Sequence, residues 1–161
     1  MAPTHRLTHV DADGRTRMVD VGDKEVTDRR ARACGVIRMR PETLQAVTEN
    51  QIAKGNVLET ARLAAIMAAK RTGDLIPLCH PLALDFVDVT FETGTDCIAV
   101  EAETRVTART GVEMEAMTAA TVALLTIYDM CKAMDRGMVI GEVALVEKSG
   151  GRSGHYKRPP E

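Results

Sequence analysis

Residues 110–135 read TGVEMEAMTAATVALLTIYDMCKAMD, and this stretch decides the fold because it predicts one long helix. Its middle, residues 116–128, is apolar or small on every side, whereas charged residues occupy both ends. A helix that is apolar all round is normally buried on all sides. A chain of 161 residues has little material with which to surround such a helix. We therefore expect other subunits to cover part of it.

The charged residues at the two ends of the predicted helix lie far apart. Glu115 and Asp129 are separated by fourteen positions, which corresponds to about 21 Å along a helix axis. Side chains at two helix ends with that separation cannot easily contact the same atoms of a small molecule. If both ends serve active sites, we expect each site to be built from more than one subunit.

The composition fits one ordinary domain and excludes several classes of protein. Hydrophobic residues make up 45% of the chain, which is enough for a core, although there is no Trp and there are only two Phe and two Tyr. A net charge of −2 gives no general attraction to nucleic acid or to an anionic membrane. No apolar run is long enough to span a bilayer, and no two of the four cysteines have metal-ligand spacing. We expect a reduced, cytoplasmic protein with free thiols.

The pattern along the chain predicts an α+β fold. A hairpin is expected in residues 5–21, where Asp13 and Gly14 supply the turn. Helices are expected in residues 41–53 and 57–71, followed by a loop in residues 72–81. Apolar residues predict strands in residues 33–39, 84–91, 97–108 and 138–146. These elements would pack as a four-stranded antiparallel sheet with the helices on one face.

The whole chain, residues 1–161, is expected to form a single domain. Neither an internal repeat nor a second domain is visible in the sequence. Residues 1–14 and the glycine-rich tail, residues 152–161, are expected to be mobile unless something binds them.

Two polar residues outside the long helix have positions that suit chemistry. His80 lies between Pro77 and Pro81, which stiffen the backbone as a positioned site residue requires. Lys54 precedes Gly55 at a helix junction, where a lysine can meet a phosphate. The ordinary alternatives are a loop histidine bonded to a carbonyl group and a solvated lysine at a turn.

Two further basic residues could reach a phosphate. Arg29 belongs to a basic run that includes Arg30 and Arg32, although a solvated face is the commoner interpretation of such a run. Lys148 precedes residues 149–151, which have the composition of a phosphate-binding loop but lack its spacing and its following helix.

The remaining candidate site residues are charged and lie at the two ends of the long helix. Asp129 and Lys132 are neighbours on one helix face. They form either a surface ion pair or a partly buried pair with shifted pKa values that moves protons. Glu113 and Glu115 could serve a site, but the helix dipole alone explains acids in a first turn. Together these side chains suit a phosphate-bearing substrate that undergoes proton transfers, and no metal site is visible.

Five segments, in chain order, resemble the cyclic pyranopterin monophosphate synthase family of molybdenum-cofactor biosynthesis. They are MVDV (18–21), KGNVLETAR (54–62), AAKRTGDLIPLCHPL (68–82), TGVEMEAMTAATVALLTIYDMCKA (110–133) and KSGG (148–151). The LCHP loop and the GVEMEA…IYDMCK helix are together highly specific. The resemblance runs through nearly the whole chain and is weakest at the termini and around residues 92–97.

The resemblance implies a fold, an assembly and a reaction. It implies a ferredoxin-like α+β fold and a homohexamer, a trimer of dimers, with active sites at subunit interfaces. It also implies a phosphorus–oxygen lyase. That enzyme rearranges (8S)-3′,8-cyclo-7,8-dihydroguanosine 5′-triphosphate to cyclic pyranopterin monophosphate and releases diphosphate. No cofactor is expected, and whether Mg²⁺ accompanies the triphosphate is left open.

The resemblance also assigns site residues. Asp129 matches the family's catalytic aspartate, and Lys54 and Lys132 match its essential lysines. Arg29 matches a phosphate-binding arginine. The complete set expected to bind substrate is Leu78, Cys79, His80, Met114, Glu115, Glu113, Arg29 and Lys148.

Two other kinds of protein stay open on the residues alone. A non-catalytic nucleotide sensor would use the same basic side chains but would release a triphosphate unchanged. A structural oligomerisation domain would use the long helix as an interface, and no ligand would then change its melting temperature.

Overall fold

The structure is a computed structural model that describes residues 13–152 and 154–159. Its centre is an antiparallel sheet with the strand order β2-β3-β1-β4-β5. The strands are β1 (Thr27–Arg38), β2 (Phe86–Thr93), β3 (Cys97–Ala108), β4 (Val139–Ser149) and β5 (Tyr156–Lys157). The first four strands follow the ferredoxin-like order, so the predicted α+β class and fold are confirmed.

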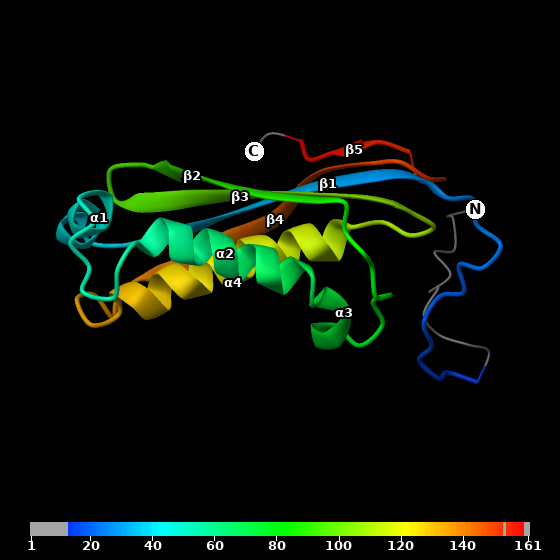
Figure 1. Cartoon of the computed structure of the whole chain (residues 1–161), viewed down its shortest axis with the longest axis horizontal. Helices are drawn as coiled ribbons and strands as arrows, with labels where there is room; N and C mark the ends of the chain where they lie inside the picture. Colours follow the sequence, from blue (N-terminus) through cyan, green and yellow to red (C-terminus); the bar gives the residue numbers. More distant parts are fainter. Residues whose placement is uncertain (1–12, 153, 160–161) are drawn as a thin grey trace, which may run out of the picture.

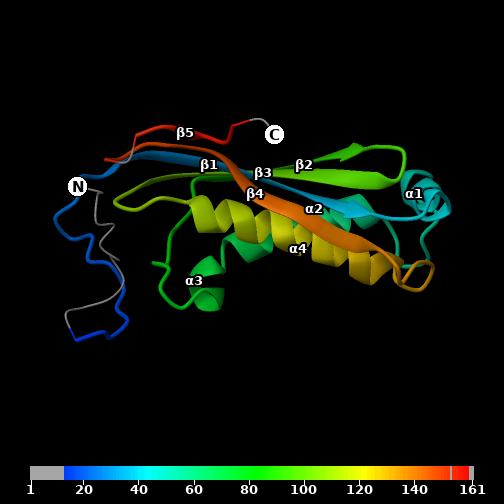
Figure 2. The same cartoon turned by 180° about the vertical axis from the view of Figure 1, so that it is seen from behind.

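The helices are α1 (Pro41–Thr48), α2 (Val57–Ala69), α3 (Thr72–Leu75) and α4 (Glu113–Cys131). Helices α2 and α4 lie on one face of the sheet, as predicted, and α1 lies at one end of the sheet (Figure 1). Helices α2 and α4 run side by side beneath the strands (Figures 1 and 2). The start of α4 lies near α3, at one end of the molecule, and the end of α4 lies at the other (Figure 2).

Small side chains let α4 approach the sheet closely. Alternate residues of β1 face the helices, and Ala31, Ala33 and Ile37 are almost fully buried there. A Cβ atom built on Gly35 would lie 2.6 Å from the Leu124 side chain of α4. Alanines also dominate the buried side of α4, so the core is filled by close backbone approach rather than by aromatic rings.

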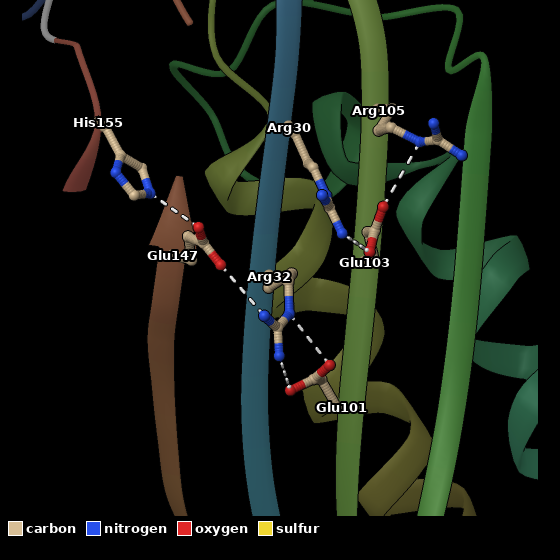
Figure 3. A network of polar contacts seen from close by, with 7 residues as sticks. All are labelled: Arg30, Arg32, Glu101, Glu103, Arg105, Glu147 and His155. Atoms are coloured by element: carbon tan, nitrogen blue, oxygen red, sulfur yellow. Dashed lines mark hydrogen bonds and ion pairs between the residues drawn. The ribbon is translucent and has the colours of Figure 1, made fainter. Parts of the chain in front are cut away.

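The opposite face of the sheet carries a network of charges, which Figure 3 shows. Arg32 bonds Glu101 at 2.6 Å and Glu147 at 3.1 Å, and Arg30 bonds Glu103 at 2.6 Å. His155 bonds Glu147 at 2.7 Å beside the short strand β5. The solvated-face interpretation of the basic run is therefore right for Arg30 and Arg32, whose side chains alternate away from the helices.

The structure changes several details of the expected fold, and one is that helix α3 occupies residues 72–75 of the segment expected to be a loop. The hairpin is not confirmed: residues 5–12 lie outside the described residues, and residues 13–21 contain a turn, a single bridge residue and no strand. The sheet gains a fifth strand, β5. Helix α4 is continuous as predicted, but in a single chain it is not buried on all sides, because Leu125 is 57% exposed.

Candidate functional site

The loop after α3 and the first turn of α4 face one another across a pocket of about 270 Å³. We call it the helix-start pocket. The loop contributes Leu78, Cys79 and His80, and the helix contributes residues 113–115. Six of the residues expected to bind substrate thus line one cavity, although the loop and helix groups are 33 positions apart in the sequence at the nearest. Val19, Val21 and Lys24 line its remaining side.

Local backbone contacts fix the shape of this loop. The N–H of Cys79 donates to the Ile76 carbonyl at 3.0 Å, which closes a turn. Gly73 of α3 packs against Pro81, where an added Cβ would lie 3.2 Å from the proline Cα. The ring of His80 bonds the Val19 carbonyl through Nε2 at 2.8 Å. Because a carbonyl oxygen only accepts, Nε2 carries a proton.

Two groups in the helix-start pocket have perturbed pKa values. Burial raises the pKa of Glu115 to about 7, and the nearby Glu113 carboxylate adds to the rise. Burial also raises the pKa of the Cys79 thiol, with a smaller contribution from Glu115. Glu115 therefore titrates near neutral pH, as a group that moves protons should. The Cys79 thiol stays protonated at that pH and is no ready nucleophile.

A second, larger pocket of about 500 Å³ adjoins the first. We call it the basic pocket, because its walls carry Lys24, Arg29, Arg30, Arg109 and Arg152. The two pockets share Lys24, Thr110, Gly111 and Glu113 as wall residues, so they are adjacent and have part of one wall in common. Lys148 approaches the same wall through its bond to Glu113 at 2.9 Å.

Arg29 is held in the basic pocket by the glycines that follow β4. Gly150 and Gly151 adopt φ of +96° and +70°, a conformation that favours glycine. A Cβ on Gly151 would overlap the Arg29 guanidinium, so the two groups are in tight contact. The Arg29 Nε is buried and has no hydrogen-bond partner among the described residues. Such a donor suits an anion.

Three residues expected to be catalytic meet at the opposite end of the molecule. Lys54, in the loop before α2, bonds the Asp129 carboxylate at 2.9 Å and its backbone carbonyl at 2.8 Å. Lys132, one turn further along the chain, bonds the other Asp129 oxygen at 2.7 Å. We call these three residues the lysine–aspartate cluster. Of the two interpretations of Asp129 and Lys132, the structure of one chain shows the exposed ion pair.

The two lysines determine the charge state of the cluster. Hydrogen bonds from Lys132 and then from Lys54 lower the pKa of Asp129 to about 2. The same bond raises the pKa of Lys132. At neutral pH the cluster therefore holds two ammonium groups around one carboxylate, with a net charge of +1.

The expected site residues thus fall into two groups rather than one. The helix-start and basic pockets bring together Leu78, Cys79, His80, Glu113, Met114, Glu115 and Arg29, with Lys148 beside them. The lysine–aspartate cluster lies at the far end of α4, as the length of the helix predicted. Lys24, Arg109 and Arg152 line the basic pocket but were missed. Arg109 directly precedes the TGVEME segment, and that adjacency is the one signal that could have indicated it.

Neither a metal centre nor a membrane span is found in the part of the chain that the structure describes. In residues 13–152 and 154–159, no three His, Cys, Asp or Glu side chains are grouped so as to hold a metal ion. Within the same residues, none of the helices has both the length and the apolar character needed to cross a bilayer.

Comparison with known proteins identifies the family of this chain. A relative from Mycobacterium tuberculosis named "Cyclic pyranopterin monophosphate synthase 3" is 60% identical over 153 residues, 94% of this chain and 86% of its own length. Proteins named "Cyclic pyranopterin monophosphate synthase" from Novosphingobium aromaticivorans and a Roseiflexus species are 61% and 59% identical. They cover 94% and 93% of this chain and 96% of their own lengths. Because the MoaC family model also matches residues 18–151, the chain belongs to the MoaC family.

Proposed function

We propose that this chain is a cyclic pyranopterin monophosphate synthase, which carries out an early step of molybdenum-cofactor biosynthesis. Its substrate would be the 3′,8-cyclised dihydro-GTP, and its products would be cyclic pyranopterin monophosphate and diphosphate. The observation that carries the proposal is the pair of adjacent pockets at the start of α4, which together we call the hollow: one contains a near-neutral acid, and the other is lined by cations. The names of relatives at about 60% identity support the same reaction.

The two halves of the hollow suit the two halves of this substrate. The helix-start pocket offers the guanine-derived part an imidazole, a thiol, a thioether and a carboxyl group. The basic pocket offers the triphosphate a set of guanidinium and ammonium groups, including the guanidinium of Arg29. Charge grows on the departing diphosphate when a ribose hydroxyl attacks the α-phosphate. Fixed cations at that place lower the barrier electrostatically.

The rearrangement also requires several proton transfers. A five-membered ring derived from the purine opens and a pyrazine ring closes, and each step moves protons between nitrogen, carbon and oxygen atoms. Lys54, Lys132 and Asp129 would serve these steps as catalytic residues. Glu115 is a further group that can exchange a proton near neutral pH, because its pKa is about 7.

The lysine–aspartate cluster can join this chemistry only if it reaches the hollow of another chain. Glu115 and Asp129 are about 21 Å apart along one continuous helix. We therefore propose active sites shared between subunits, within a homohexamer built as a trimer of dimers. The exposed apolar side chains of α2 and α4, such as Leu63 at 61% and Leu125 at 57%, support burial against other copies.

The proposal requires neither a bound metal nor an organic cofactor. The cations that meet the phosphates are the chain's own lysine and arginine side chains, with Mg²⁺ on the triphosphate as an optional addition. The four cysteines are free thiols, which fits a cytoplasmic enzyme in a reducing compartment.

Turnover of the cyclised dihydro-GTP tests the proposal. The purified protein should release diphosphate in a coupled phosphate assay, with cyclic pyranopterin monophosphate identified by mass spectrometry. Lys54→Ala should lower kcat on the order of 10² to 10⁴, while Lys157→Ala, which removes an exposed lysine of the short strand β5, should leave it unchanged. Binding without turnover would favour a nucleotide sensor. A melting temperature unmoved by the triphosphate would favour an oligomerisation domain.

A further inference from the structure

The turn that follows β4 forms one wall of the basic pocket. Residues 149–152 all line that pocket, and among these four only Arg152 carries a charge. Gly151 is in tight contact with the guanidinium of Arg29. The position of this turn therefore determines where two cations of the basic pocket lie.

In the described part of the chain, mainly backbone hydrogen bonds hold this turn in place. The short strand β5 that follows it lies at the edge of the sheet, where it pairs with β4. The N–H of Gly154 donates to the Gly151 carbonyl at 3.2 Å, and the N–H of Arg158 donates to the Val146 carbonyl at 2.8 Å. Every residue from 154 to 159 is exposed. A segment with few buried apolar contacts opens at little cost in free energy.

A side-chain contact also ties this exposed segment to the sheet. Nε2 of His155 bonds one carboxylate oxygen of Glu147 at 2.7 Å, and the other oxygen bonds Arg32 at 3.1 Å. Arg32 in turn bonds Glu101 of β3, so the contact ends a chain of ionic groups that crosses three strands (Figure 3). Glu147 is thus fixed from the side of β1, and His155 is its partner on the side of the turn.

The contact between His155 and Glu147 depends on pH through the histidine. The hydrogen bond from His155 lowers the pKa of Glu147, and Arg32 lowers it further against the opposing effect of burial. Because that pKa lies below the ordinary value of 4.5, Glu147 stays ionised at pH 6 and above. Histidine is the side chain whose charge ordinarily changes between about pH 5 and pH 8. The ion pair therefore exists at the acidic end of that range and is lost as the pH rises.

The other charged groups around this contact are lysines and arginines. Lys157 lies opposite Glu147 in the register of β4 and β5, and Lys148 is the next residue of β4. Arg30 of β1 interacts with Glu147 over a longer distance, and Arg158 follows β5. Lysine and arginine side chains ordinarily titrate above about pH 10. A change in this contact between pH 6 and pH 8 is therefore a change in the histidine.

We infer that His155 is a positioning residue for the basic pocket: when protonated it binds Glu147, docks β5 on β4 and so holds Gly151 and Arg152 in the pocket wall. The inference deepens the proposed function and rests on it, because it takes a triphosphate as the ligand of the basic pocket. An exposed ion pair changes an equilibrium by up to about fivefold. The affinity for triphosphate should therefore fall about two- to fivefold as His155 loses its proton.

Two substitutions at position 155 test the inference by fixing the charge in opposite states. His155→Gln is neutral and His155→Lys is charged at both pH 6 and pH 8. Calorimetry with inorganic triphosphate should give His155→Gln a Kd about two- to fivefold above wild type at pH 6 and equal to it at pH 8. His155→Lys should equal wild type at pH 6 and bind more tightly by the same factor at pH 8. Comparing the proteins at one pH cancels the protonation of the ligand itself.

Lys157→Ala is the matched control, because it removes a cation from β5 and leaves the contact between His155 and Glu147 in place. Its Kd should follow that of wild type at both pH values. In turnover of the cyclised dihydro-GTP, the two position-155 variants should change KM in the same pattern and leave kcat unchanged. Melting temperatures show that each variant is folded.

The results that would overturn the inference differ from those that would refute the proposed reaction. Equal Kd values for wild type and His155→Gln at pH 6, or Gln and Lys variants that depart from wild type by one common factor, would overturn the positioning role. Wild-type protein that does not bind inorganic triphosphate at either pH would overturn it as well. Binding that shifts as expected, in a protein that never releases diphosphate from the cyclised substrate, would refute the proposed reaction. The role of His155 in the basic pocket would then stand.

Discussion

Glu115 should make the stability of this protein depend on pH in a direction opposite to that of an ordinary ion-paired carboxylate. Its side chain is only 4% exposed, and burial raises its pKa from 4.5 to about 7. A raised pKa means that the folded state holds a proton that the unfolded state has lost. Stability is therefore fully present below about pH 4.5 and falls as the pH rises through about 7. The proton-linkage relation gives a loss of about 2.5 kcal/mol between pH 5 and pH 8.

Glu115→Gln removes this titration while keeping the size and shape of the side chain. Relative to wild type, the variant should gain about 2.5 kcal/mol in free energy of unfolding between pH 5 and pH 8. Urea denaturation at both pH values, at one fixed protein concentration, measures the change. Glu42→Gln, at an exposed position in the first turn of α1, controls for the loss of a carboxylate elsewhere. Curves for wild type and Glu115→Gln that shift in parallel would refute the claim that burial of this carboxyl costs free energy.

Three further predictions follow from single contacts. Asp129→Ala and Lys132→Ala should each lower kcat on the order of 10² to 10⁴. The double variant should be no slower than the slower of the two single variants. If the two losses in kcat multiply instead, the residues have independent roles. Gly35→Ala should lower the free energy of unfolding by about 1–3 kcal/mol, because the new Cβ would lie 2.6 Å from the Leu124 side chain. Gly141→Ala is the control, because no atom lies within 4 Å of a Cβ added there. Gly151→Ala should raise KM about tenfold or more, because the new Cβ displaces Arg29. Gly154→Ala should leave KM unchanged, because Gly154 has a similar positive φ but no atom lies within 4 Å of the added Cβ. Equal KM values in the two variants would show that Arg29 does not bind substrate.

The sequence predicted those elements whose periodicity is uninterrupted. Strand β3 occupies residues 97–108 as predicted, because Glu101, Glu103 and Arg105 alternate with residues of the buried face. Strand β1 begins at Thr27, six residues earlier than predicted. Its first half carries Arg30 and Arg32, which look like a solvated loop until their glutamate partners on neighbouring strands are known. Helix α1 ends at Thr48, five residues early, and Asn50 then adopts φ of +55°.

Elements that depend on a distant partner could not be predicted. Strand β5 is two residues long and exists only through pairing with β4, and nothing in residues 156–157 marks them as a strand. The turn at Asp13 and Gly14 was predicted correctly, since Gly14 adopts φ of +79°, but a turn does not specify which strands pair across it. The basic pocket is assembled from three separate segments, so Arg109 and Arg152 gave no signal as a group.

Asp129 illustrates how the charge state of a residue limits its role in the proposed reaction. Both of its carboxylate oxygens are bonded to lysines, and its pKa is about 2, so at neutral pH it has no proton to give. It can orient the two lysine side chains, which have N–H groups to donate, and it raises the pKa of Lys132. The group with a pKa suited to exchange near neutral pH is Glu115, at the other end of the helix. A site that used both ends would therefore combine fixed proton donors from one chain with a titrating acid from another, and neither chain alone would hold the complete set.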